Sequence, residues 1–223
     1  MSHLHAFFGN KHVTADSTYR SLRRSHTSCR LKADRAGYWI PAAFANGARV
    51  TPTIVSFYYR SRTYPLTAVR PFPRGLKMIA GDSHATGPQR EGVVYWDCDN
   101  GGPDAHVDHP VDCGSGTVSA HVIFPECWDG KHLDSSDHKS HMAYGKDPDD
   151  DGRFSCPARH PVPVPRLFFS ISYPIHDGTR LTLASGSPFT MHADFINSWR
   201  QRKLKALVNR CIHRETDCGA VSS

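Results

Sequence analysis

The sequence lacks several features that define common protein classes. Its 223 residues contain no run of 18 apolar residues, so we expect no helix that spans a membrane. The GxSxG, P-loop and GxGxxG patterns are absent, which removes the main support for lipases, nucleotide hydrolases and dinucleotide-dependent enzymes. No two cysteines form a close CxxC pair, which argues against a zinc ribbon or a thioredoxin-like site.

Glycine and proline, in contrast, are plentiful and indicate the fold class. With 17 Gly and 16 Pro, the chain is interrupted about every seven residues, which favours short strands joined by ordered loops. Segments rich in β-branched and aromatic residues predict strands at 38–44, 53–59, 76–80, 93–96, 118–124, 167–173 and 180–184. The Asn46-Gly47 pair between two apolar runs predicts a hairpin.

Two helices complete the predicted fold. Thr14 or Asp16 would cap a short helix that ends near Arg24. Apolar residues recur at helical spacing between Phe195 and Ile212, opposite a basic face, so this segment would pack its apolar stripe on a sheet. We therefore expect a mainly β fold, a single-domain β-sandwich or jelly roll over residues 1–212, with the carboxyl-terminal helix packed on it, long ordered loops and a disordered tail at 213–223.

The seven cysteines indicate the compartment. Their wide spacing in a loop-rich chain is typical of disulfides in an exported protein, so we expect an extracellular protein whose leader is absent from this chain. Cys98 with Cys113, Cys127 with Cys156, and Cys29 with Cys211 are plausible pairs, and Cys218 would then keep a free thiol. The sequence alone does not fix this connectivity.

The charge distribution bears on possible partners. The net charge is +6, and 15 histidines make it depend strongly on pH below about 6.5. The basic residues fall in two separate clusters, at 20–35 and 200–210, with no alternating aromatic residues to stack on bases. We therefore interpret the clusters as solvated faces, expect no nucleic-acid partner, and expect a monomer.

His3 and His5 form the first candidate site. On a strand, two residues spaced i and i+2 point to the same side, which is the spacing needed to bind a metal or an anionic substrate. A third ligand would have to come from elsewhere, with His192 or His141 as candidates. The alternative is a structural pair beside Phe7 and Phe8.

The segment from Phe124 to His141 is the richest in reactive side chains. Three aspartates and three histidines lie within its last 13 residues, which include Asp129, Asp134, His138 and His141. Such density suits general acid–base catalysis or metal binding, whereas the alternative is an ordered loop held by Asx turns and a disulfide at Cys127.

Two further aspartates are candidates in other parts of the chain. Asp82 follows a predicted strand and precedes His84 by two residues, so it is either a site residue or a turn cap. Asp194 follows His192 by two residues and would either cap the carboxyl-terminal helix or serve as a catalytic carboxylate.

Several of these stretches together resemble a known family. The similar stretches are Ser2-His3-Leu4-His5, Tyr38-Trp39-Ile40-Pro41, Phe72-Pro73-Arg74-Gly75, Ala80-Gly81-Asp82, Phe124 to Gly130, Leu133 to His141, Cys156-Pro157, His160-Pro161-Val162 and His192-Ala193-Asp194-Phe195. From residue 2 to about residue 211, the chain resembles the secreted bacterial and fungal family called domain of unknown function nineteen-ninety-six. The resemblance implies export and a carbohydrate-rich setting but supplies no reaction. Where relatives often carry an acidic or amide residue after the second histidine of HxH, this chain has Ala6.

Three functions follow as hypotheses. The first is an extracellular enzyme that acts on polysaccharide, with a catalytic set of Asp82, Asp129, Asp134, His138, His141 and Asp194. The second is a secreted protein that binds copper or zinc through His3, His5 and His192. The third is a non-catalytic cell-wall carbohydrate-binding module. In each case the expected partner is polysaccharide or cell-wall material, and the metal is the one cofactor that we consider.

Overall fold

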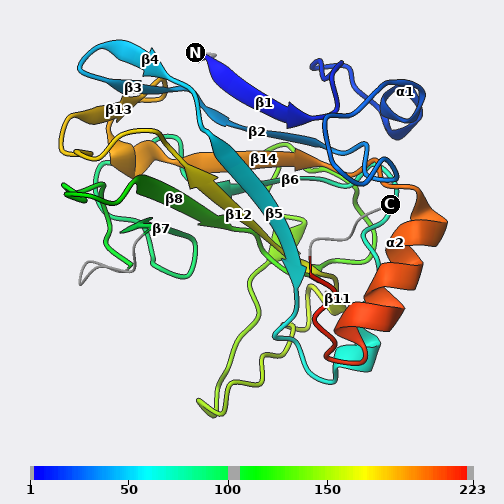
Figure 1. Cartoon of the computed structure of the whole chain (residues 1–223). Helices are drawn as coiled ribbons and strands as arrows, with labels where there is room; N and C mark the ends of the chain where they lie inside the picture. Colours follow the sequence, from blue (N-terminus) through cyan, green and yellow to red (C-terminus); the bar gives the residue numbers. More distant parts are fainter. Residues whose placement is uncertain (1–2, 100–105, 220–223) are drawn as a thin grey trace.

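Two antiparallel sheets packed face to face form the body of the computed structural model, which describes residues 3–99 and 106–219 (Figure 1). Sheet I has the strand order β1 (His5–Gly9), β2 (Gly37–Pro41), β14 (His192–Ile196), β6 (Lys77–Gly81). Sheet II has the order β5 (Ile54–Arg60), β12 (Arg166–Ser172), β8 (Val118–Ile123), β7 (Val94–Cys98). Sequence neighbours such as β1 and β2 pair directly, whereas β14 inserts between β2 and β6 from far along the chain.

Smaller elements surround the two sheets. The structure contains the short strands β3 (Ala43–Ala45), β4 (Ala48–Val50), β9 (Cys127–Trp128), β10 (Met142–Ala143), β11 (Val162–Pro163) and β13 (Leu181–Leu183). It also contains the helices α1 (Tyr19–Arg24), α2 (Gln201–Leu207), the 3-10 turns η1 (Leu66–Ala68) and η2 (Pro188–Thr190), and the π-helical turn η3 (Val208–Ile212). None of the helices within the described ranges is long and apolar enough to cross a bilayer.

The core lies between the sheets and is built from aromatic side chains. Tyr38 and Phe195 of sheet I pack against each other, and the Tyr38 ring meets Phe57 and Phe169 of sheet II. The Tyr38 and Phe57 rings stack with their centroids 3.8 Å apart. Burial of each such side chain contributes roughly 1.5–3 kcal/mol. The predicted mainly β fold is therefore confirmed.

The predicted hairpin is also present. Asn46 and Gly47 join β3 to β4 with φ of 50° and 78°, the left-handed conformations that a type I′ turn requires. The first helix begins later than predicted, because Thr18, rather than Thr14 or Asp16, accepts the amide of Ser21 and closes a capping box.

The prediction of a helix starting at Phe195 is wrong. Phe195 lies in β14, which pairs with β2 on one side and β6 on the other, and helix α2 begins only at Gln201. β14 forms hydrogen bonds with a neighbouring strand along each of its edges, and all of its residues are buried. These interactions stabilise the strand more than the helical spacing of its apolar residues favours a helix. Helix α2 and the following turn η3 (orange and red in Figure 1) do bury an apolar stripe, which consists of Leu204, Val208 and Ile212.

The disulfides partly agree with prediction. Cys98–Cys113 and Cys127–Cys156 are confirmed. The Cys29–Cys211 pair is wrong, because Cys211 bonds Cys218 as the chain turns back after the helix, and Cys29 rather than Cys218 keeps a free thiol. Burial raises the pKa of the Cys29 thiol to about 12, so this group is an unreactive one.

Candidate metal centre

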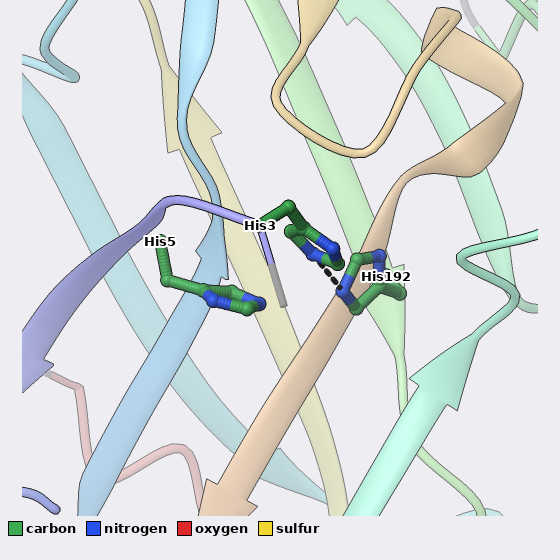
Figure 2. Close-up of side chains that lie close together, drawn as sticks. All are labelled: His3, His5 and His192. Atoms are coloured by element: carbon green, nitrogen blue, oxygen red, sulfur yellow. Dashed lines mark hydrogen bonds between the residues drawn. The ribbon is translucent and has the colours of Figure 1, made fainter. Parts of the chain in front are cut away.

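The outer face of sheet I carries the candidate site. Successive strand residues alternate between the two faces, so the neighbours of the inward-facing Tyr38 and Phe195 point away from the core. This places His5 of β1 and His192 of β14 on the outer face, and His3 lies two residues before the start of β1. Figure 2 shows the three imidazoles turned toward one another from these two strands.

The three histidines lie close enough to share one ion after a small adjustment. One ligand nitrogen from each lies within 4.8 Å of the others, and the Nε2 atoms of His3 and His192 are 3.1 Å apart. Two nitrogens bound to one tetrahedral ion at about 2.0–2.1 Å lie about 3.4 Å apart. The closest pair is already near this separation, and the other nitrogens, all within 4.8 Å of one another, have to approach by at most about 1.4 Å through side-chain rotation.

The tautomer of His192 is fixed by the backbone. Its Nδ1 lies 2.8 Å from the carbonyl oxygen of Thr190, which only accepts, so Nδ1 carries the proton and donates it. The lone pair is therefore on Nε2, which faces His3. In metal sites, the ring nitrogen of a histidine that does not bind the metal usually donates its hydrogen to such a carbonyl or to a carboxylate, which fixes the ring orientation.

All three imidazoles are held in the neutral form. Burial, together with the positive charge that a protonated neighbouring histidine would carry, lowers the pKa of His5 and of His192 to about 4. Burial also lowers the pKa of His3. Neutral imidazoles present free lone pairs at neutral pH, the form that binds metals.

Gly81 allows β6 to approach β14 closely beside His192. Its φ is +82°, and a Cβ at this position would lie 2.5 Å from the carbonyl oxygen of Met191 and 2.9 Å from the Cα of His192. Any other residue would push the two strands apart and displace His192.

Asp194 lies two residues beyond His192 on the same face. Its side chain is unusual, because it is only 8% exposed and its Oδ2 has no hydrogen-bond partner within the described part of the chain. Burial raises its pKa to about 7, although the positive charges of His138 and Lys139 act in the opposite direction. Asp194 lies in a strand, so the prediction that it caps the carboxyl-terminal helix is wrong.

The loop from Asp129 to His141 lies along the edge of β6. The amides of Lys77 and Ile79 donate to the carbonyls of Leu133 and His138. His141 is buried, and its two ring nitrogens contact different elements. Its Nδ1 lies 2.7 Å from the hydroxyl of Ser135 in the loop, and its Nε2 lies 2.7 Å from the carbonyl oxygen of Lys77 in β6, so His141 holds the loop against the sheet.

The acidic candidates of sequence analysis take different positions. Asp134 contacts His138 Nδ1 at 2.5 Å and Lys77 Nζ at 3.4 Å, at the edge of the outer face. Asp129 accepts the amides of Lys131 and His132 in a turn of the loop. Asp82 accepts the amide of His84 at 2.9 Å, as a turn cap does. Asp194 therefore lies on the histidine strand itself, whereas Asp129 and Asp82 are engaged in turns.

Phe7 is a neighbouring aromatic residue that was not predicted as part of the site. Phe7 is 53% exposed on the outer face, and its ring lies 5.7 Å from that of Trp39 and 6.1 Å from that of His5. The i and i+2 alternation that pairs His3 with His5 extends to Phe7, so the signal was present in the sequence.

Comparison with known proteins gives one match. A family model described as Domain of unknown function (DUF1996) matches residues 1–199. The chain has no match among curated proteins or among solved structures.

Proposed function

We propose that this chain, which belongs to the family described as Domain of unknown function (DUF1996), is a secreted protein that binds one copper or zinc ion through His3, His5 and His192. The observation that carries the proposal is the convergence of three neutral imidazoles from two strands that are far apart in sequence. Imidazole nitrogens favour copper and zinc among the common metals.

The position of the cluster supports a site that is open to ligands. His3 and His5 are only partly buried, and they lie on the outer face of the sheet rather than in the core. Three protein ligands leave a fourth position of a tetrahedral ion free, as in catalytic zinc sites. When bound, the metal would supply Lewis acidity to a group at that free position.

The protein's own residues would orient the ligands and handle protons. Thr190 holds the His192 ring through its carbonyl, and Asp194 offers an unpaired carboxyl oxygen on the same strand face. In the metal-free protein, burial raises the pKa of this carboxyl group to about 7. A carboxyl group so placed is a candidate for proton exchange with a bound ligand.

The secreted location is supported by the three disulfides. They are the bonds that persist in oxidising compartments and are rare in cytosolic proteins.

A polysaccharide partner is the second candidate, and the exposed Phe7–Trp39 pair favours it. Their ring planes differ by 31°, and they lie beside His5 on the open face. Aromatic rings at such a surface offer apolar faces to a sugar. Polysaccharide hydrolysis by an aspartate pair stays a prediction, with Asp194 and Asp134 as its carboxylates on this side of the sheet.

Isothermal titration of tag-free protein with Zn²⁺ and with Cu²⁺ tests the metal site. We expect one ion per chain for the wild type and loss of that ion in His5→Ala and His192→Ala. His12→Ala is the matched control, because His12 is an exposed histidine that contacts Ser25 beyond the opposite end of β1. Equal metal binding by the wild type and both site variants would refute the proposal.

A further inference from the structure

A pocket of about 240 Å³ lies next to the candidate metal centre, on the far side of β6. Ile79, Val93, Pro125 and Met142 give it apolar walls, and the ring of Tyr144 closes one side. No single sequence motif defines it, because its walls come from four separate segments, at 79–82, 89–93, 125 and 139–144.

Two contacts connect the pocket to the metal centre. Gly81, which lines the pocket, is the strand partner of His192, so the pocket wall lies one strand away from that ring. Gln89, also in the lining, donates its Nε2 to the carbonyl of Met191 at 2.8 Å and so holds the residue before His192.

The pocket carries two cations that form no salt bridge among the described residues, although the charge of Lys139 acts on the carboxyl group of Asp194. Lys139 Nζ donates to the carbonyl of Gly81 at 2.7 Å, and the Arg90 guanidinium lies over the Tyr144 ring, 4.8 Å from its centroid. Neither forms an ion pair with an acid in the described part of the chain. Asp82, the acid in the lining, binds the backbone of His84 instead.

We propose that this pocket binds a carboxylate carried on a ring-sized body, such as a uronic acid unit of an acidic polysaccharide. Arg90 and Lys139 would hold the carboxylate, and the ring would lie against Ile79, Met142 and Tyr144. An inorganic anion would leave these apolar walls in contact with water, so the walls favour an organic acid.

The pocket is then the anionic subsite of the ligand that reaches the metal. This role rests on the proposed metal-binding function, whereas the binding of the carboxylate itself does not. A polysaccharide with one uronic acid unit in the pocket would pass over Gly81 to reach His192, and it would continue toward Phe7 and Trp39 on the outer face.

Titration calorimetry with D-glucuronate tests the proposal, with methyl glucoside as the neutral ring and sulfate as the inorganic anion. We expect glucuronate to bind at least about tenfold more tightly than either of the other two, and more weakly at high salt. Arg90→Gln combined with Lys139→Gln should weaken glucuronate binding at least about tenfold. Arg49→Gln removes an exposed arginine of β4 and is the matched control.

Arg90→Gln alone guards against misfolding of the double variant, because the Arg90 side chain contacts the Tyr144 ring and makes no hydrogen bond among the described residues, while the bonds to its carbonyl are kept in the variant. It should weaken glucuronate binding at least about threefold with an unchanged melting temperature. Equal binding of glucuronate and methyl glucoside, equal binding of sulfate, or unchanged affinity in the variants would each overturn the proposal.

His192→Ala separates this proposal from the metal site. We expect it to lose the metal and to keep the glucuronate affinity of the metal-free wild type. If the wild type binds glucuronate but no metal, the proposed function fails and the carboxylate site stands. If it binds the metal but not glucuronate, the pocket proposal fails and the metal site stands.

Discussion

The depressed pKa values of the histidines predict an unusual pH dependence of metal binding. Protons and the metal compete for the same nitrogen lone pairs, so lowering the pH weakens binding by a factor of 1 + 10^(pKa−pH) for each ligand. For an ordinary imidazole with a pKa near 6.5, this factor is about 30 at pH 5.0, and for three such ligands it is about 3 × 10⁴.

The proposed metal site should lose far less metal affinity at pH 5.0 than three ordinary imidazoles would. With pKa values of about 4, His5 and His192 together weaken binding at pH 5.0 by only about 1.2-fold. The pKa of His3 is also lowered, so its factor stays below the roughly 30-fold of an ordinary imidazole. From pH 7.5 to 5.0 we therefore expect the zinc affinity to fall by less than about 40-fold, and to fall steeply only below about pH 4.

Competition titrations with a chelator of known proton affinity, at pH 7.5, 6.0 and 5.0, would measure this. A peptide with three solvent-exposed histidines is the control and should lose binding steeply below pH 6.5. A loss of 10³-fold or more in the protein by pH 5.0 would refute the reasoning, because it would show that the imidazoles titrate as if exposed.

Four further predictions test the fold. Gly81→Ala should destabilise the protein by about 2 kcal/mol or more and weaken zinc binding, measured by thermal unfolding and titration, because its Cβ would meet Met191 and His192; an unchanged melting temperature would contradict this. Replacing Cys127 and Cys156 together by Ser should cost about 3–4 kcal/mol in urea unfolding, from a 29-residue separation. A loss below about 1 kcal/mol would mean that the loop is held without the bond. Tyr38→Phe should cost about 1–3 kcal/mol, because it removes the 2.5 Å hydrogen bond to buried Asp34. Burial raises the Asp34 pKa to about 6, so its ionisation should lower stability as pH rises from about 4 to 6, and Asp34→Asn should flatten that slope.

The local part of the site was predictable from the sequence. The i and i+2 spacing of His3 and His5 places both imidazoles on one side of an extended segment, whatever the rest of the fold does. The Asn46-Gly47 hairpin is local in the same sense, because two residues determine the turn.

The choice of the third histidine was not predictable in this way. His192 and His141 were both candidates, and strand order decides between them: β14 inserts beside β2, whereas the loop ending at His141 is fastened to Lys77 at the far edge of β6. Non-local strand pairing of this kind leaves no periodicity in the sequence.

The wrong helix start has the same origin. The apolar residues at the end of β14 and those of α2 follow each other so closely that one helical pattern fits both. Only the pairing with β2 and β6 shows that His192–Ile196 form a central strand. The predicted Cys29–Cys211 pair failed for a similar reason, because the closure of Cys211 on Cys218 depends on the turn after the helix.

The most direct measurement is an anomalous difference map, collected at the zinc absorption edge, from crystals of tag-free protein grown with one equivalent of Zn²⁺. We predict a single dominant peak about 2.0–2.1 Å from one nitrogen each of His3, His5 and His192. A map whose dominant peak lies elsewhere on the chain, or that shows no peak among these three rings, would contradict the assignment of this face as a metal centre.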